Sequence, residues 1–248
     1  MTTLRQDFKA ARCVLFDLDL TVADTLAAHL ATAREIFQTK RSLLLPNWEK
    51  ELFTGNLSDE TLRQLYFNPS GDEVLAYFNG RVEKEVLRDD IGRVFRSFRH
   101  LITVYDAFFQ VLDLCRERKK QTGIITNADR QEAKVVLDVA RESFWCQAYN
   151  LEETLRRMPV VATENMLPKP NLAPLHAFRR NYPRIRLDPV SLYLGDEWQD
   201  MVFARNADLV GVYIDRKFGC EPGQAATPFK QRYHRVVSLD EFFKAVSE

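Results

Sequence analysis

Two carboxylates stand directly after a short apolar run near the start of the chain, and this feature most constrains the fold. Residues 13–16 are Cys-Val-Leu-Phe, and Asp17 and Asp19 follow with one leucine between them. Such a run is typical of a parallel strand buried on both faces, which ends at the sheet edge where α/β proteins bind ligands. Because residues two apart share one face of a strand, the two carboxylates are expected side by side. Two close carboxylates do not both ionise easily, which favours acid chemistry for one and nucleophilic chemistry for the other.

Polar residues follow two later apolar runs in the same way. Residues 123–127 (Gly-Ile-Ile-Thr-Asn) predict a strand that ends in a hydroxyl, and residues 192–196 (Leu-Tyr-Leu-Gly-Asp) predict one that ends in a carboxylate. Asp200 comes four residues after Asp196, which is one helical turn further on. Lys169 stands between two prolines, just before a predicted helix.

The order of these residues resembles the four motifs of the haloacid dehalogenase superfamily of phosphatases, over residues 13–200. The nearest likenesses within it are phosphoglycolate phosphatases and related sugar-phosphate or nucleotide phosphatases. The resemblance implies a Rossmann-like α/β fold, a doubly wound parallel sheet of strand order 5-4-1-2-3, with an all-helical mobile cap inserted after the first strand. One departure is Leu20, where the family usually has glycine.

The resemblance also implies catalytic and metal-binding roles. Asp17 is the expected nucleophile, which forms an aspartyl-phosphate, and Asp19 is the expected acid and base. The carboxylates of Asp17 and Asp196 and the backbone carbonyl of Asp19 are the expected ligands of Mg²⁺, since this ion prefers a few protein oxygens and retains water.

Five further residues receive binding or supporting roles by the same resemblance. Thr126 and the backbone N–H of Asn127 are expected to hold the phosphate, and Lys169 to neutralise charge on the transferring group. Asp200 is expected to orient Lys169 or a metal-bound water. Thr21 is expected to hydrogen-bond within its own loop. Glu197 is interpreted as an acidic residue of a helix's first turn rather than as a ligand.

The spacing of apolar residues divides the chain into a core in two segments and a cap between them. Residues 1–23 contain the first strand, residues 24–100 have helical periodicity, and residues 101–248 alternate between helices and strands. Asp17 and Asp196 must meet to share a metal, so the first strand is expected between the strands that end at positions 126 and 195.

The second core segment is expected to contain five strands and several helices. The strands are predicted at 122–126, 159–162, 190–195, 209–214 and 235–237, and the helices at about 104–119, 129–141, 171–181, 198–206 and 239–246. Residues 144–163 are longer than a crossover needs; a short helix is expected over 151–157, and no function is assigned to this segment.

Two groups of cap residues are candidates for substrate contact. Residues 53–60 resemble the family's substrate-selecting loop, and they are equally typical of a helix start capped by Ser58. Arg93, Arg96 and Arg99 are three apart and form a stripe able to bind a carboxylate or second phosphate, although a solvated helix face is the commoner explanation. Three aromatic residues are interpreted as cap core rather than a base-stacking platform: Trp48, Tyr66 and Tyr77.

Composition excludes several other classes of protein. A hydrophobic fraction of 46% in 248 residues is enough for a core. The 35 basic residues equal the 35 acidic residues, so no general field favours nucleic acid. No apolar run approaches the ~18 residues of a membrane span, and the N-terminus lacks a signal-peptide pattern. Four widely spaced cysteines without a CxxC pair are typical of reduced thiols, so a cytoplasmic location is expected, with the oligomeric state open.

The favoured interpretation is a Mg²⁺-dependent phosphatase that acts on a small phosphorylated metabolite. The alternative is a phosphomutase of the β-phosphoglucomutase type, which shares all four motifs. Those mutases carry an arginine after the serine of the cap loop, whereas Asp59 follows Ser58 here. A non-catalytic phospho-ligand-binding protein on the same fold is the third possibility, but it would be expected to lose Asp17 or Asp19, and both are present.

Overall fold

The chain forms two compact units in the computed structural model. The larger unit comprises Met1–Asp24 and Thr103–Glu248, and the smaller comprises Thr25–Ile102. The structure describes residues 3–44, 78, 81–163, 166–215 and 233–247.

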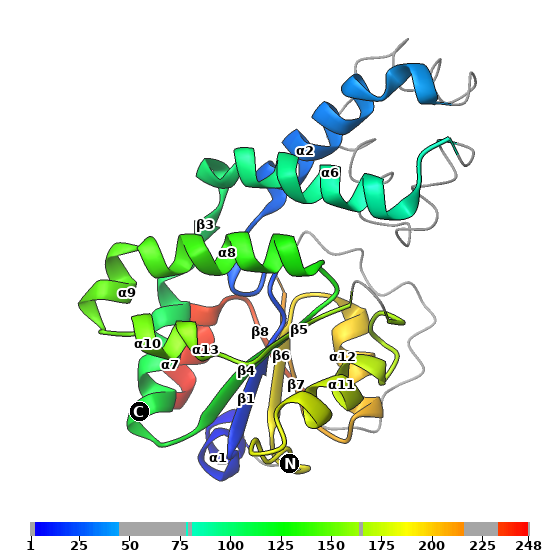
Figure 1. The fold of residues 1–248 in the computed structure, drawn as a ribbon. Coiled ribbons are helices and arrows are strands. Elements are labelled where there is room, and N and C mark those ends of the chain that lie inside the picture. The colour runs from blue at the N-terminus through cyan, green and yellow to red at the C-terminus, as the bar shows by residue number, and fades with distance from the viewer. Residues whose placement is uncertain (1–2, 45–77, 79–80, 164–165, 216–232, 248) are drawn as a thin grey trace. The chain divides into compact units, whose positions relative to one another are not determined.

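A six-stranded parallel sheet of order β5-β4-β1-β6-β7-β8 is the centre of the larger unit (Figure 1). Its strands are β1 (Cys13–Phe16), β4 (Gln121–Thr126), β5 (Val160–Ala162), β6 (Leu192–Gly195), β7 (Val210–Ile214) and β8 (Tyr233–Val236). Counted along the chain within this sheet, β1, β4, β5, β6 and β7 are strands 1 to 5, so the predicted order 5-4-1-2-3 is confirmed. The sixth strand, β8, lies beside the fifth, β7. The central strand β1 lies between β4 and β6, as expected from the need to bring Asp17 and Asp196 together.

Helices cover both faces of the sheet, so the predicted doubly wound α/β fold is confirmed. On one face lie α11 (Ala173–Asn181) and α12 (Trp198–Asn206), and on the other lie α7 (Asp106–Glu117) and α13 (Leu239–Ser247) (Figure 1). All four residues of β1 have no exposed surface, which explains their continuous apolar run. The other helices among the described residues of this unit are α1 (Leu4–Ala10), α8 (Arg130–Glu142), α9 (Phe144–Ala148) and α10 (Glu152–Arg156).

Besides a helix within residues 144–163, two parts of the larger unit were not predicted. Helix α1 begins with a capping box between Thr3 and Gln6, a signal that is present in the sequence. Its residue Phe8 packs edge-on against the ring of Phe242 at 5.9 Å between centroids, so α1 belongs to the core. The short strands β2 (Ala23–Asp24) and β3 (Thr103–Val104) pair antiparallel, so Val104 lies in a strand and α7 starts only at position 106.

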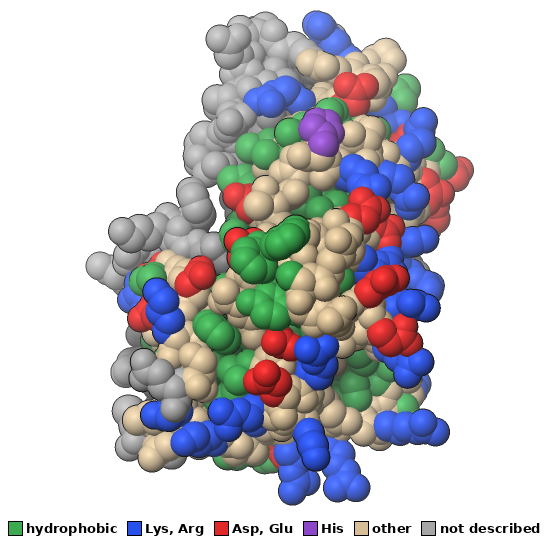
Figure 2. All heavy atoms as spheres, turned by 90° about the vertical axis from the view of Figure 1, so that its left-hand side faces the viewer, with side chains coloured by type: hydrophobic (Ala, Val, Ile, Leu, Met, Phe, Trp, Pro, Cys, Tyr) green, Lys and Arg blue, Asp and Glu red, His purple; other side chains and the backbone are tan. Residues whose placement is uncertain are grey.

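Residues 144–163 form two short helices, α9 and α10, of which only the second was predicted. The rings of Phe144, Trp145 and Tyr149 follow one another along α9, with centroids 5.3 and 5.9 Å apart. Phe144 is 71% exposed. Figure 2 shows hydrophobic side chains gathered on this side of the molecule, with charged side chains around them.

The described part of the smaller unit is helical, in agreement with the predicted periodicity. It contains α2 (Leu26–Thr39), η1 (Arg41–Leu43), α6 (Lys84–Ser97) and η2 (Arg99–Leu101). Its core includes Leu30, Ala33 and Phe37 of α2, and Phe37 stacks on Phe78. The candidate arginines do not share one helix, because α6 ends before the third of them; Arg93 pairs with Asp90. The cap loop 53–60, together with Trp48, Tyr66 and Tyr77, lies outside the described residues.

Two findings bear on the chain's environment. In the part of the chain that the structure describes, no helix has the length and apolar character needed to cross a membrane. Cys13, Cys115 and Cys146 are buried free thiols, and burial raises the pKa of Cys13 and of Cys115 to about 12, which makes these two thiols unreactive. Cys220 lies outside the described residues.

The N-terminal capping residue of α8, Asp129, leads to a prediction about stability. Asp129 accepts hydrogen bonds from the backbone N–H groups of Gln131 and Glu132 at 2.7 and 2.9 Å. Asp129→Ala is expected to lower the free energy of unfolding by about 1 kcal/mol, measured by urea denaturation. The control is Asp138→Ala, which removes only a partly exposed ion pair with Arg141 in the same helix and should cost less than about 0.5 kcal/mol. Equal losses in the two variants would show that the cap does not stabilise α8.

Candidate active site

Strand β1 delivers Asp17 to the carboxyl edge of the sheet. The strand ends at Phe16, and the Asp17 N–H extends the pairing by one residue because it donates to the Leu194 carbonyl at 2.7 Å. The chain then turns, and the Leu18 carbonyl accepts from the N–H groups of Val22 and Ala23. The expectation that Asp17 and Asp19 share a strand face is therefore wrong, because Asp19 lies in the turn.

The same turn places Leu20, the departure from the family pattern, in a conformation that favours glycine. This residue has φ of 54°, in the left-handed region that glycine enters without steric cost. Its N–H donates to the Ala23 carbonyl at 2.7 Å, which closes the turn. The backbone thus keeps a glycine-like conformation although the residue is leucine.

Lys169 lies at the centre of the site and is only 3% exposed. Its Nζ donates to Asp17 Oδ1 at 2.5 Å and to Asp200 Oδ1 at 2.6 Å. A third hydrogen bond, at 2.9 Å, goes to the hydroxyl of Tyr193 on β6. An ammonium group has three N–H donors, so all of them are used within the protein.

Asp200 reaches this position from the first turn of α12. Its Oδ2 accepts from the backbone N–H of Glu197 at 3.1 Å, while its Oδ1 faces Lys169. The carboxylate lies directly over Gly195, where a Cβ atom would come within 2.5 Å of the Asp200 Cβ. Residue 195 must therefore lack a side chain for Asp200 to reach Lys169.

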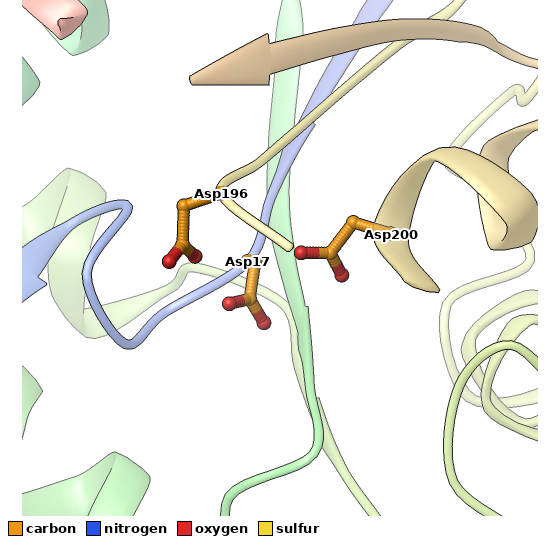
Figure 3. A group of neighbouring side chains, drawn as sticks. All are labelled: Asp17, Asp196 and Asp200. Atoms are coloured by element: carbon orange, nitrogen blue, oxygen red, sulfur yellow. The ribbon is translucent and has the colours of Figure 1, made fainter. Parts of the chain in front are cut away.

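Asp196 stands at the end of β6 and is 8% exposed. Its Oδ1 accepts a hydrogen bond at 3.1 Å from the hydroxyl of Thr21, so Thr21 does not bond within its own loop as expected but reaches across to the neighbouring strand. Figure 3 shows the carboxylates of Asp17, Asp196 and Asp200 turned toward one another from three parts of the chain. Oxygen atoms of these three groups lie within 4.8 Å of one another.

Thr126 and Asn127 follow β4 and connect to the lysine loop. Thr126 is 1% exposed, and its Oγ1 accepts from the Ala128 N–H at 3.0 Å. The side chain of Asn127 accepts from the backbone N–H of Lys169 at 2.8 Å and donates to the Lys169 carbonyl at 3.4 Å. The hydroxyl of Thr163 donates to the Asn127 carbonyl at 3.0 Å. These bonds fix the backbone on both sides of the lysine.

The site carries more negative than positive charge. Burial raises the pKa of Asp17 well above its ordinary value; Lys169 opposes the shift, while Asp200 and Asp19 add to it. Burial also raises the pKa of Asp196, and the charges of Asp17 and Asp200 add to that shift. Burial alone would lower the pKa of Lys169, but the two carboxylates outweigh it and raise that pKa. The lysine is therefore charged, and the carboxyl groups of Asp17 and Asp196 ionise less easily than an exposed carboxyl.

A hard divalent cation fits these carboxylates. Both oxygens of Asp200 are hydrogen-bonded, one to Lys169 and one to Glu197 N–H, which favours Asp17 and Asp196 as ligands and Asp200 as a support. The raised pKa values of Asp17 and Asp196 indicate that added positive charge would stabilise their ionised forms. The pKa of Glu197 is also raised, by burial and then by Asp200.

Tyr193 is a site residue that the sequence analysis missed. It was included only in the apolar run of its strand, although it is fully buried with its hydroxyl among Lys169, Asp200 and the Ile125 carbonyl. The signal was present, because a tyrosine in a strand buried on both faces needs a hydrogen-bond partner inside the protein.

The family model described as haloacid dehalogenase-like hydrolase matches residues 14–213, most of the chain. The comparison with curated protein sequences gave no match.

Solved structures share the fold over nearly the whole chain. A Lactobacillus plantarum protein assigned as a phosphoglycolate phosphatase is 16% identical, with TM-score 0.62, over 95% of this chain and 99% of that one. CbbY from Rhodobacter sphaeroides, in complex with phosphate, is 12% identical, with TM-score 0.63, over 96% and 100%. The Bacillus subtilis HAD-hydrolase YfnB, bound to magnesium, is 15% identical, with TM-score 0.57, over 96% and 99%. At these identities the likeness shows the fold.

The charge imbalance at Asp196 generates a prediction about pH. A carboxyl whose pKa is raised on folding destabilises the folded state increasingly as pH rises above its ordinary value of about 3.9. In a chelator, Asp196→Asn should therefore unfold at higher urea concentration than the native protein at pH 7, and the difference should shrink toward pH 4. The control is Asp208→Asn at an exposed position. A difference independent of pH would contradict the charge imbalance.

Proposed function

This chain belongs to the haloacid dehalogenase-like hydrolases, and from that premise we propose that it is a Mg²⁺-dependent phosphatase of small phosphorylated metabolites. The observation that carries the proposal is the buried Lys169 ammonium, which bonds to the carboxylates of Asp17 and Asp200 at the carboxyl edge of the sheet. A nucleophilic carboxylate beside a fixed positive charge suits the transfer of a phosphoryl group, which carries negative charge.

The first step transfers the phosphoryl group to the protein. An oxygen of the Asp17 carboxylate attacks phosphorus, and the bond from phosphorus to the leaving oxygen breaks as the new bond forms. Asp19 donates a proton to that leaving oxygen. The charge of Asp19 contributes to the raised pKa of Asp17, which supports a position of Asp19 close to the nucleophile.

The second step returns the phosphoryl group to water. Asp19, now ionised, takes a proton from the attacking water, and the bond between phosphorus and the Asp17 oxygen breaks. The products are inorganic phosphate and the regenerated Asp17 carboxylate. Lys169 neutralises charge on the phosphoryl group in both steps, and Thr126 with the Asn127 N–H orients its oxygens.

Asp17, Asp196 and the Asp19 carbonyl are the proposed Mg²⁺ ligands. When bound, the cation would neutralise charge on the phosphate and orient it toward Asp17. The fit is supported by the grouped carboxylate oxygens of Asp17 and Asp196, and a structural relative is described as bound to magnesium. Residues 24–100 are the proposed cap, and residues 1–23 and 101–248 the proposed core.

The first test is activity against a panel of phosphorylated metabolites with Mg²⁺, using Asp17→Asn as the inactive variant. Asparagine keeps the shape of the side chain but is neither a nucleophile nor an anionic ligand, so turnover should fall by at least about 1,000-fold. Chelation should silence the native protein, and Mg²⁺ should restore it.

Asp208→Asn, at an exposed position, is the matched control and should retain full activity. Turnover of Asp17→Asn within about tenfold of the native rate would exclude the covalent mechanism.

A second test separates a phosphatase from a phosphomutase, which would form the same aspartyl-phosphate. A mutase must exclude water and bind a bisphosphate with cationic cap groups. Mutases of the β-phosphoglucomutase type carry an arginine after the serine of the cap loop, whereas Asp59 follows Ser58 here. Hydrolysis in ¹⁸O-water should therefore place label in the released phosphate at every turnover, without need of a bisphosphate activator. Fast, bisphosphate-stimulated isomerisation of a hexose phosphate with slow phosphate release would establish the mutase instead.

A further inference from the structure

Tyr193 has a buried hydroxyl to which the proposed mechanism assigns no role. It lies in β6 between two leucines and has no exposed surface. Burial of a hydroxyl costs free energy unless the group is hydrogen-bonded, so its partners indicate why it is there.

The hydroxyl of Tyr193 links two strands and the lysine. It donates to the Ile125 carbonyl on β4 at 2.8 Å, and Lys169 Nζ donates to it at 2.9 Å. A hydroxyl has one hydrogen, and the Ile125 carbonyl at 2.8 Å is a closer acceptor for it than Asp200 Oδ1 at 3.4 Å, so a lone pair remains for the ammonium. Since β1 lies between β4 and β6, the tyrosine spans the strand that leads to Asp17.

The three acceptors of the Lys169 ammonium differ in what the reaction does to them. Asp17 gains and loses a phosphoryl group in each turnover, so its contact with Lys169 must change. Asp200 and Tyr193 take no part in bond making, and both are held by backbone groups, at Glu197 N–H and the Ile125 carbonyl. They can therefore keep the ammonium in place while Asp17 reacts.

We propose that Tyr193 is a positioning residue that holds the Lys169 ammonium toward Asp17 and the transferring group. This inference rests on the proposed function, in which Lys169 neutralises charge on the phosphoryl group. Tyr193 touches neither substrate nor metal in this proposal and acts only through the lysine.

The test compares two tyrosine-to-phenylalanine variants. Tyr193→Phe removes the hydroxyl but keeps the ring, whose centroid lies 5.5 Å from Lys169 Nζ. Tyr182→Phe is the matched control, because its hydroxyl also bonds to backbone, to the N–H and carbonyl of Val160 on β5 at 3.3 and 3.2 Å. Tyr182 is partly buried and packs against the core cluster that contains Tyr193, so its substitution measures the loss of a backbone-bonded hydroxyl in the same part of the core.

Kinetics with Mg²⁺ and the best substrate of the panel provide the first readout. Loss of a hydrogen bond to a charged group should lower the kcat of Tyr193→Phe by about 10- to 100-fold. Its KM should stay within about threefold, since charge on the phosphoryl group is greatest in the transition state. Tyr182→Phe should keep its kcat within about twofold. Equal kcat values for the two variants would overturn the proposal.

A spectroscopic readout tests the contact without any activity. In protein labelled with ¹⁵N at lysine Nζ, the buried Lys169 ammonium should give a protected signal, identified by its loss in Lys169→Met. The native signal should show cross-peaks to the Tyr193 ring. These cross-peaks test the contact between Lys169 and Tyr193 even where a variant fails to fold. It should shift or exchange faster in Tyr193→Phe and stay unchanged in Tyr182→Phe.

A Lys169 signal unmoved in Tyr193→Phe, or a native protein without these cross-peaks, would overturn the proposal. An inactive native protein that shows the expected spectra would instead refute the proposed function and leave the contact between Tyr193 and Lys169 established.

Discussion

The buried ion pairs of Lys169 with Asp17 and Asp200 are the interaction on which the rest of the site depends. Removing three charged groups from water is costly, and the cost is offset only by good geometry and further hydrogen bonds. The Nζ distances of 2.5 and 2.6 Å and the third bond to Tyr193 meet that condition. Lys169 thereby joins three segments far apart in the sequence: the loop after β1, the loop before α11 and the first turn of α12.

Neighbouring features of the fold follow from the position of this ammonium. Gly195 lacks a side chain, which lets Asp200 approach, and Asn127 bonds to the backbone on both sides of the lysine. The central place of β1 puts Asp17 between the strands that carry Thr126 and Asp196. The sheet order and the ion pairs therefore support each other. The sheet brings Asp17, Lys169 and Asp200 together, and their ion pairs stabilise the carboxyl edge of the sheet.

The fold was largely predictable because the central strands β1, β6 and β7 are almost fully buried and therefore appear as short apolar runs between helical patterns. The place of β1 between β4 and β6 was predictable from the need for Asp17 and Asp196 to meet, and the full strand order was implied by the family resemblance. The capping box of α1 was present in the sequence but overlooked, and β2 and β3 are too short to produce an alternating pattern.

The candidate site was predictable as a set of residue types and in the contact of Asp200 with Lys169, while its other contacts were not. Spacing two apart suggested a shared strand face for Asp17 and Asp19, but strand geometry ends at Phe16, where the turn closed by Leu20 begins. The partner of Thr21 lies 175 residues away, and no local rule identifies it. The roles assigned to the site residues stay predictions.

The most direct test of a nucleophilic Asp17 held beside Lys169 is chemical trapping during turnover. Borohydride reduces an aspartyl-phosphate to homoserine, so rapid quenching of the working enzyme into borohydride should convert one aspartate. Peptide mass spectrometry should find homoserine at position 17, dependent on substrate and absent from positions 19, 196 and 200. Steady release of phosphate with no homoserine at position 17, or with homoserine at another position, would contradict this mechanism.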